Sequence, residues 1–284
     1  IGTPGTAKNA LTVGASENLL STGGIQKKIG ELKSSPENWP VAPITESKMS
    51  DDVNGIAMFS SRGPTADGRT KPDIVSPGTN ILSTRSQQQG ASELWGAYNQ
   101  YYTYSGGTSM ATPLTAGAAA IARQYLIEKK GIAAPSAALV KAYLLHTASE
   151  MFPGQYGAVG ASRGQELLTV RPNNDEGYGR TNIQEVVAST APTYVEQSVG
   201  VATGTVQEFK YTIPAGKVVA NLVWTDAPGS VNASKALVND LDLEVVLPDG
   251  TVLANNDSIN NHSFVQGPST AGTITVRVKG VNVP

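Results

Sequence analysis

A serine at the start of an apolar, helix-forming stretch is the residue of this sequence best suited to nucleophilic chemistry. Ser109 lies in residues 105–113, which read Ser-Gly-Gly-Thr-Ser-Met-Ala-Thr-Pro. Gly106 and Gly107 lack a Cβ atom, so they would let a substrate backbone approach the hydroxyl. The free N–H groups and positive dipole end of a helix N-terminus would stabilise an oxyanion that develops beside Ser109. A lone serine at a helix start is usually only an N-cap; the complete nine-residue segment is what favours a nucleophile.

A nucleophilic serine needs a general base, and the sequence contains two histidines, both of which follow Ser109. His146 ends an apolar helical run, where the helix dipole favours a histidine with a structural role. His262 is expected in a solvated loop. The order Ser109, Asp257, His262 is that of α/β-hydrolases, but those enzymes carry Gly-x-Ser-x-Gly and residue 111 is alanine, which argues against that class.

Four aspartates in the last third of the chain offer oxygen ligands for a cation. Asp240 and Asp242 are two residues apart on an expected strand, so their carboxylates share a face about 6.5 Å apart. Asp226 and Asp257 lie on adjoining expected loops. Because Ca²⁺ takes about six to eight oxygen ligands, the four carboxylates predict part of a structural calcium site. The alternative is an exposed acidic face without a metal.

Short apolar runs and helical patterns alternate up to about residue 190. Residues 10–15 and 74–75 have the composition of buried strands, and residues 16–54 predict a long surface loop. Helices are predicted over residues 108–129 and 136–146, the second with Ser136 as its N-cap. The apolar side of the first helix is expected to contain Met110, Leu114, Gly117, Ile121 and Tyr125.

The segment between the second strand and the first helix is rich in glutamine and tyrosine. Its aromatic residues are Tyr98, Tyr101, Tyr102 and Tyr104. Their closeness to Ser109 in the sequence allows a role in contacting substrate. Packing of the rings against the domain is the favoured interpretation, because tyrosine is usually buried on its apolar side.

After residue 191 the pattern becomes all-β. Residues 207–213, 241–245 and 273–278 alternate between apolar and polar, and Asp249-Gly250 predicts a tight turn. The sequence therefore predicts two domains, an α/β domain over residues 1–190 and a β-sandwich of the jelly-roll type over residues 191–284. Both are expected to be truncated, the first at its start and the second at its end.

Composition excludes several classes of partner. Charged residues make up 15% of the 284 residues and the net charge is −2, so nothing favours binding to nucleic acid or to an anionic membrane. There is no cysteine, so disulfides and thiolate chemistry are absent. No apolar run reaches the roughly 18–20 residues of a membrane span, and the first residues do not have the pattern of a signal peptide.

Several segments together resemble the subtilisin-like (subtilase) serine proteases. Residues 107–113 match the Gly-Thr-Ser-Met-Ala-x-Pro motif around the catalytic serine. Further segments that resemble the catalytic domain of that family are residues 6–15, 59–64, 71–78 and 177–180. Residues 222–229 and 238–243 resemble the C-terminal β-barrel of the KP-43-like alkaline serine proteases.

This resemblance implies a secreted endopeptidase that hydrolyses peptide bonds of protein and peptide substrates through an acyl-enzyme. Ser109 would be the nucleophile and its N–H one oxyanion donor, with Thr108 in support. In the order Asp, His, Ser of that family, the base, its aspartate and the oxyanion asparagine all precede the serine, so they are expected in an N-terminal part of the catalytic domain that is missing here. The resembling proteases bind calcium.

The sequence therefore predicts a chain that is inactive alone. The alternative, from a different functional class, is a calcium-stabilised structural or binding module with an orphaned nucleophile.

Overall fold

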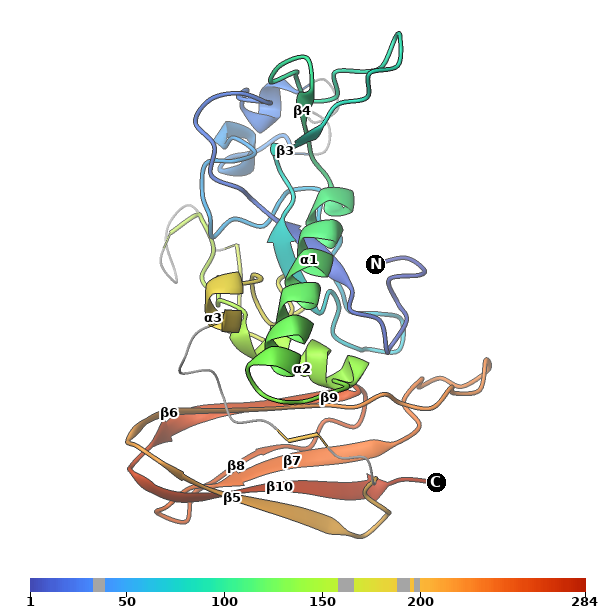
Figure 1. The fold of residues 1–284 in the computed structure, drawn as a ribbon, viewed down its shortest axis with the longest axis vertical. Coiled ribbons are helices and arrows are strands. Elements are labelled where there is room, and N and C mark those ends of the chain that lie inside the picture. Colours follow the sequence, from blue (N-terminus) through green and yellow to red (C-terminus); the bar gives the residue numbers. More distant parts are fainter. Residues whose placement is uncertain (33–38, 158–165, 188–194, 197–199) are drawn as a thin grey trace.

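The molecule has two parts, a mixed α/β part followed by a part that contains only strands. The computed structural model describes residues 1–32, 39–157, 166–187, 195–196 and 200–284. Figure 1 shows helix α1 along the middle of the α/β part and the strands of the second part, here called the β-region (residues 200–284), stacked below helix α2. The predicted boundary at residue 190 lies outside the described residues.

Two short parallel strands lie at the centre of the α/β part. Strand β1 (Val13–Ser16) pairs with β2 (Ile74–Pro77), and Gly14 lies opposite Val75. Ile74 and Val75 are fully buried, as is usual for parallel strands covered on both faces. The two predicted strands are confirmed.

The chain between these strands is mostly irregular, as predicted, but it is not confined to the surface. Its regular elements among the described residues are two 3₁₀ turns, η1 (Ile29–Glu31) and η2 (Ile44–Glu46). Ile29 and Met49 are buried, so the segment contributes to the interior of the α/β part.

Helix α1 (Thr108–Glu128) packs on β1 and β2 and has nearly the predicted bounds. The predicted buried face is wrong, because Leu114 and Ile121 are 41% and 37% exposed. The buried positions carry mostly small residues: Ala111, Thr115, Ala118, Ala122 and Leu126. Close packing against the strands requires small side chains, so volume rather than hydrophobicity selects the inner face.

Helix α2 (Ala137–Thr147) begins at the predicted N-cap, where the Leu139 N–H donates to Ser136 Oγ at 3.0 Å. It packs against α1 and against the short helix α3 (Ile183–Val187). The Oη of Tyr143 donates to the Val186 carbonyl at 2.8 Å, which fixes α3 to α2.

A two-stranded hairpin extends beyond the N-terminal end of α1 (Figure 1). It consists of β3 (Ile81–Thr84) and β4 (Tyr102–Ser105). Tyr104 is 7% exposed, whereas Tyr98, Tyr101 and Tyr102 are between 44% and 60% exposed. The interpretation that these tyrosines pack against the domain is therefore right for Tyr104 and wrong for Tyr101 and Tyr102. Tyr98 contacts the ring of Tyr104 but stays largely exposed.

The β-region consists of six antiparallel strands in two sheets. Four of them form one sheet in the order β5-β10-β7-β8, and β6 pairs with β9 in the other. Their bounds are β5 (Val206–Ile213), β6 (Gly216–Val223), β7 (Asp240–Val246), β8 (Val252–Asn255), β9 (His262–Ser269) and β10 (Gly272–Asn282). The predicted strands are confirmed, and the predicted turn at Asp249-Gly250 joins β7 to β8, with Gly250 at φ 87°.

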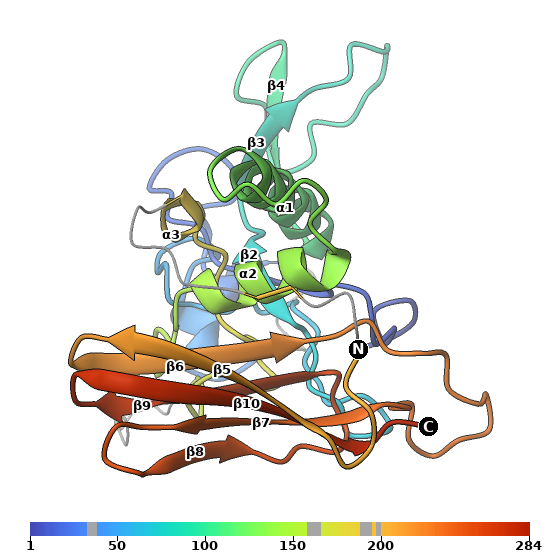
Figure 2. The same cartoon turned by 60° about the horizontal axis from the view of Figure 1, so that its bottom comes forward.

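The β6–β9 pair lies between α2 and the four-stranded sheet (Figures 1 and 2). Val218 and Val265 pack with Leu243 and Ile274 in a core between the two sheets. On its other side, Phe264 joins the main core of the α/β part. Strand β9 is therefore covered on both sides, and the two parts share the core to which Phe264 belongs. Across the described residues no helix is both long and apolar enough to cross a membrane.

Candidate functional site

Ser109 lies exposed in the first turn of α1. Gly107 is the N-cap, so no side chain caps the first turn, and no acidic residue lies in that turn. The first N–H groups of a helix have no acceptor within the helix. The N–H groups and dipole of α1 are thus available to an anion that forms at Ser109.

The end of strand β2 holds the start of α1 in place. The Gly107 N–H donates to the Gly78 carbonyl at 2.7 Å. A Cβ at residue 78 would lie 2.6 Å from the Cβ of Ala15 and 2.9 Å from the Gly107 carbonyl oxygen, so only glycine allows this approach. Gly107 itself has φ 139°, a conformation that favours glycine. Ser109 is thus supported by backbone contacts between the start of α1 and the end of β2.

The two glycines before Thr108 serve different purposes. A Cβ atom at residue 107 would meet Ser109 N first, at 3.7 Å, so the prediction that Gly107 leaves room for a substrate fits its surroundings. At Gly106 the corresponding space is filled by the ring of Trp95, whose Cη2 would lie 1.9 Å from a Cβ atom. Gly106 is therefore required for contact with Trp95, which is a correction to its predicted role in substrate approach.

The role of Thr108 in supporting the oxyanion stays a prediction. Its carbonyl accepts a hydrogen bond from Thr112 Oγ1 at 2.8 Å, which closes the first turn of α1.

Neither histidine lies near Ser109. His262 begins β9, and His146 is in the last turn of α2. Figure 1 shows both elements at the opposite end of α1 from its first turn, and a helix of 21 residues is about 30 Å long. The described residues therefore supply no histidine base at Ser109.

His262 is buried, so its predicted place in a solvated loop is wrong. It is 5% exposed, and its Nδ1 lies 2.7 Å from Tyr178 Oη. Burial lowers its pKa to about 4, although Asp73 acts in the opposite direction. Burial also lowers the pKa of His146 to about 4, so both rings are neutral near pH 7. The structural role predicted for His146 fits this burial, but a neutral ring gains little from the helix dipole.

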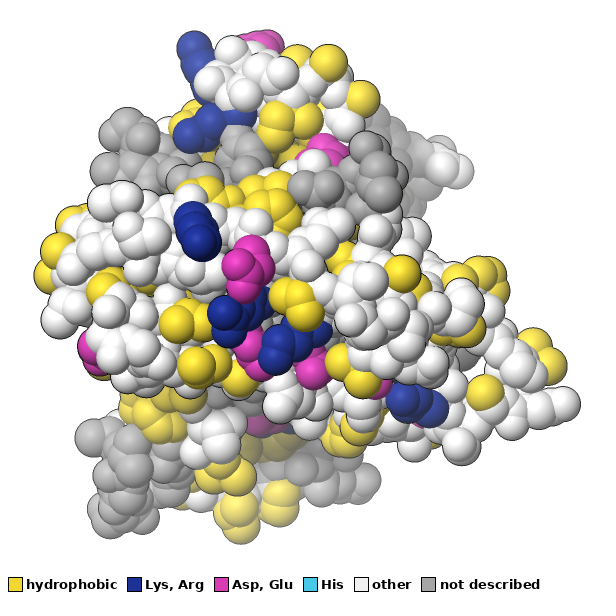
Figure 3. Space-filling view, turned by 90° about the horizontal axis from the view of Figure 1, so that it is seen from below, with side chains coloured by type: hydrophobic (Ala, Val, Ile, Leu, Met, Phe, Trp, Pro, Cys, Tyr) yellow, Lys and Arg dark blue, Asp and Glu magenta, His cyan; other side chains and the backbone are white. Residues whose placement is uncertain are grey.

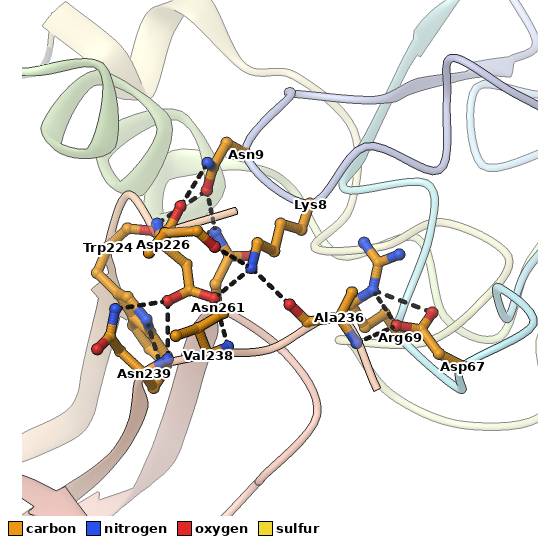
Figure 4. Close-up of polar contacts among 11 residues, drawn as sticks. Lys8, Asn9, Asp67, Arg69, Trp224, Asp226, Ala236, Val238, Asn239 and Asn261 are labelled. Carbon is orange, nitrogen blue, oxygen red and sulfur yellow. Dashed lines mark hydrogen bonds and ion pairs between the residues drawn. The ribbon is translucent and has the colours of Figure 1, made fainter. Parts of the chain in front are cut away.

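Asp226 is fully engaged by other groups (Figure 4). Lys8 Nζ lies 2.5 Å from Oδ2, and the N–H groups of Val238 and Asn239 donate to the two oxygens at 2.8 Å. Burial acts to raise the pKa of Asp226, but these donors outweigh it and hold the pKa below its usual value. The carboxylate already has a cation, so it is unsuited as a ligand of a second one.

The four predicted calcium ligands do not form one ligand set. Asp257 accepts hydrogen bonds from the N–H groups of Ile259 and Asn260. Asp240 and Asp242 remain, and burial raises the pKa of both carboxyl groups. In the part of the chain that the structure describes, no group of three or more His, Cys, Asp or Glu side chains is placed to hold a metal ion. Calcium binding stays a prediction, without a site built from these four residues.

The outer face of the four-stranded sheet is charged and largely paired. Figure 3 shows Lys, Arg, Asp and Glu side chains close together on the end of the molecule that carries the β-region. Arg277 pairs with Glu208 at 2.8 Å, and Lys279 pairs with Glu244. The alternative of an exposed acidic face formed by the four aspartates is also inaccurate, because Asp226 and Asp240 are buried.

Sequence reasoning missed a buried charge cluster between β2 and α2. Asp73 is fully buried and lies 2.6 Å from Lys71 and 2.9 Å from Lys141. Burial acts to raise its pKa, but the two lysines outweigh this and keep the carboxylate ionised. Lys71 belongs to the motif at residues 71–78, which was the only signal for this cluster in the sequence.

A family model described as the subtilase family matches residues 1–182 of this chain. The chain is 31% identical over 308 aligned residues to "Serine protease/ABC transporter B family protein tagD" of Dictyostelium discoideum, a match over 81% of this chain and 16% of that protein. It is 38% identical over 114 residues to "Serine protease AprX" of Bacillus subtilis, covering 39% of this chain and 24% of AprX. A "PII-type proteinase" of Lactococcus lactis is 40% identical over 90 residues, covering 32% of this chain and 4% of that protein. The matches thus span at most a quarter of these proteins.

Proposed function

The chain belongs to the subtilase family, and we propose that it carries the nucleophile of a serine endopeptidase, Ser109. The observation that carries this proposal is the position of Ser109. It is exposed in the first turn of a helix that has a glycine N-cap and no acidic residue in that turn. Such a turn combines an accessible hydroxyl with N–H groups directed at a developing anion.

The reaction proposed for this serine proceeds in two halves. Ser109 Oγ attacks the carbonyl carbon of the peptide bond while its proton passes to a general base. The C–N bond then breaks, the proton moves to the departing amine, and an ester on Ser109 remains. Water hydrolyses that ester by the same route and restores the hydroxyl. The Ser109 N–H stabilises the oxyanion in both halves, with Thr108 in support.

The general base must come from a polypeptide segment outside these 284 residues. Support for this comes from the positions of His146 and His262, which lie at the other end of α1. Burial also lowers the pKa of both rings to about 4, which makes them weak bases. The aspartate partner of the base and the second oxyanion donor, an asparagine, would come with it. Loss of the histidine from a subtilisin lowers turnover on the order of 10⁶-fold, so the chain alone should be almost inert.

Further properties belong to the same proposal. The β-region would be a sandwich of the jelly-roll type, because its two sheets enclose the core that contains Val218 and Leu243. The resemblance of residues 222–229 and 238–243 favours the KP-43-like branch. Secretion and protein or peptide substrates follow from the same resemblance. The domain limit at residue 190 likewise stays part of the proposal.

The test of this proposal is hydrolysis of a labelled unfolded protein, such as fluorescent casein, by the longest natural form of the protein. Ser109→Ala should abolish cleavage, while Ser105→Ala, at the nearest serine before it, should leave most activity. Equal activity of wild type and Ser109→Ala would refute the proposed nucleophile. Folded protein without any cleavage would favour the second candidate, a calcium-stabilised structural or binding module with an orphaned nucleophile, although the pairing of Asp226 with Lys8 does not support its calcium site.

A further inference from the structure

The hairpin next to the nucleophile presents an unusual number of exposed apolar side chains. Leu94, Tyr98, Tyr101 and Tyr102 are 57%, 60%, 59% and 44% exposed. Together with Trp95 they are here called the hairpin surface. They lie within residues 94–102 of one hairpin, and exposed large apolar side chains that form a patch commonly mark a binding surface.

Trp95 connects this surface to the start of α1. Its ring lies against Gly106, where no side chain larger than hydrogen fits. Phe59 supports the ring in an edge-to-face arrangement, with centroids 6.3 Å apart. Trp95 is only half-buried, so part of this residue stays accessible, and its contact with Gly106 places it beside the residues that lead into Ser109.

The hairpin surface is held in a fixed conformation by its own backbone. The Trp95 N–H donates to the Tyr104 carbonyl at 2.9 Å, and the Tyr104 N–H donates to the Gly96 carbonyl at 3.0 Å. The Tyr98 N–H donates to the Tyr102 carbonyl at 3.0 Å. The ring of Tyr98 meets the buried ring of Tyr104 edge to face at 6.1 Å. Because these contacts lie within the hairpin itself, binding would require little ordering of the surface.

The charge of the hairpin argues against an ionic ligand. Between residues 81 and 105 the charged side chains are Arg85 and Glu93, and they pair with each other at 3.2 Å. What remains for recognition is aromatic and amide chemistry. Such a surface suits uncharged, extended polypeptide and does not suit nucleic acid or an anionic membrane.

The reach of the chain places the surface within range of one bound peptide. Ser105 at the end of β4 is separated from Ser109 by four residue steps, or at most about 14 Å of extended chain. Tyr102 at the start of β4 is seven steps away, at most about 25 Å. An extended peptide of about eight residues spans that distance, so one substrate could contact Ser109 and the hairpin surface together.

We propose that the hairpin surface binds the unfolded polypeptide substrate beside Ser109, with Trp95 as the wall nearest the nucleophile, and that it selects apolar or aromatic residues a few positions from the cleaved bond. This inference rests on the proposed function, because the occupant is argued from the position of Ser109.

The test is equilibrium binding of two labelled octapeptides to the Ser109→Ala protein, measured by fluorescence anisotropy. One peptide alternates Leu and Phe with Ala, and the other contains only Gly and Ser. We expect the first to bind at least tenfold more tightly, and Tyr98→Ser combined with Tyr101→Ser to weaken it at least tenfold. The matched control replaces exposed apolar residues elsewhere, Leu168→Ser with Val231→Ser, which are 77% and 98% exposed, and should change the affinity less than twofold.

Equal affinity of the tyrosine variant and wild type, with unchanged near-ultraviolet circular dichroism, would overturn the inference. So would equal weakening by the control pair, or equal binding of the two peptides. Because Ser109→Ala has no nucleophile, peptide binding does not depend on turnover. Both readouts use the longest natural form of the protein. Peptide binding to that form without reactivity of its Ser109 would leave the hairpin surface as a binding site and refute the peptidase, and the reverse result would refute the hairpin surface alone.

Discussion

Lys8, near the start of the chain, and Asp226, just after β6, form an ion pair of 2.5 Å across the boundary between the α/β part and the β-region. The Asp226 side chain is fully buried and that of Lys8 is 10% exposed. Lys8 also donates to the carbonyls of Ala227 and Ala236, and Asn9 bonds both the N–H and the carbonyl of Asp226 (Figure 4). The first strand region and the β-region are therefore joined by satisfied buried polar groups as well as by the shared apolar core.

The Asp226→Asn substitution should destabilise the whole chain. It leaves the buried Lys8 ammonium without its counter-charge, which typically costs about 3 kcal/mol or more. Urea unfolding followed by circular dichroism measures the loss. Glu208→Gln, in the exposed pair with Arg277, is the matched control and should cost less than about 1 kcal/mol. Similar losses of unfolding free energy for the two variants would show that the buried pair contributes no more to stability than the exposed pair.

A Cβ atom at residue 106 should disturb the hairpin. Gly106→Ala forces the Trp95 ring to move, and we expect a loss of about 1–3 kcal/mol in unfolding free energy together with a change in tryptophan fluorescence. Gly117→Ala in the exposed middle of α1 meets no atom within 4 Å and should instead stabilise by roughly 0.5–1 kcal/mol. The contact is refuted if both alanine variants raise stability and leave the fluorescence of Trp95 unchanged.

Acid should weaken the contact between the two parts through His262. Its pKa is about 4 in the folded chain and about 6.5 when unfolded, so the neutral ring is favoured by folding. The buried groups facing it are Tyr178, Asp73, Lys71 and Lys141, with Asp257 from the β-region. The contribution of His262 to the free energy of unfolding is fully present above about pH 6.5 and is lost as the pH decreases toward 4.

This histidine should account for roughly 2–3 kcal/mol of the stability lost between pH 7 and pH 4.5. His262→Gln should remove that share, which urea unfolding at several pH values would measure. His146→Gln provides the comparison, because the pKa of the His146 ring is also lowered to about 4, but this residue lies at the end of α2. An unchanged pH slope in His262→Gln would mean that the ring is accessible to protons in the folded chain.

Alkali should weaken the chain through Glu17. Burial raises its pKa to about 8, with Gln155 acting in the opposite direction and the charge of Asp51 adding to the rise. The proton that the folded state holds is absent from the unfolded state above about pH 4.5. The contribution of Glu17 to the free energy of unfolding is therefore fully present below that pH. It is lost as the pH rises through 8, by roughly 3 kcal/mol between pH 5 and pH 8.

Glu17→Gln should flatten this decline, whereas Glu185→Gln, at an exposed glutamate of α3, should not. Thermal melting temperatures between pH 5 and pH 9 provide the comparison. A decline of equal size in both variants would assign the alkaline loss to other groups.

Local signals in the sequence predicted the elements well. The N-cap Ser136, the turn at Asp249-Gly250 and the start of α1 depend on neighbouring residues, and all three are confirmed. The inner face of α1 was not predictable from hydrophobicity, because Ala111 and Thr115 are selected by the close approach of the helix to the strands.

Contacts between residues that are distant in the sequence could not be predicted from the sequence. His262 lies in a polar run that has the composition of a loop, yet Asn261 is buried because it bonds Asn9 and the Trp224 carbonyl across the boundary. The four aspartates were grouped as calcium ligands by residue type, but one of them, Asp226, is paired with Lys8, which lies 218 positions away in the sequence. The filling of the space at Gly106 by Trp95 likewise depends on a long hairpin loop whose path has no local signal.

Reaction of Ser109 with a fluorescent fluorophosphonate tests the assignment of the nucleophile most directly. The label would be located by mass spectrometry in this chain alone and in a preparation that contains a subtilase segment with histidine and aspartate. We expect labelling at Ser109 in the second preparation, none in its Ser109→Ala variant, and no more than background in the chain alone. Rapid labelling of the chain alone would contradict the inference that this chain lacks the general base. A label that persists in Ser109→Ala would contradict the assignment of Ser109 as the nucleophile.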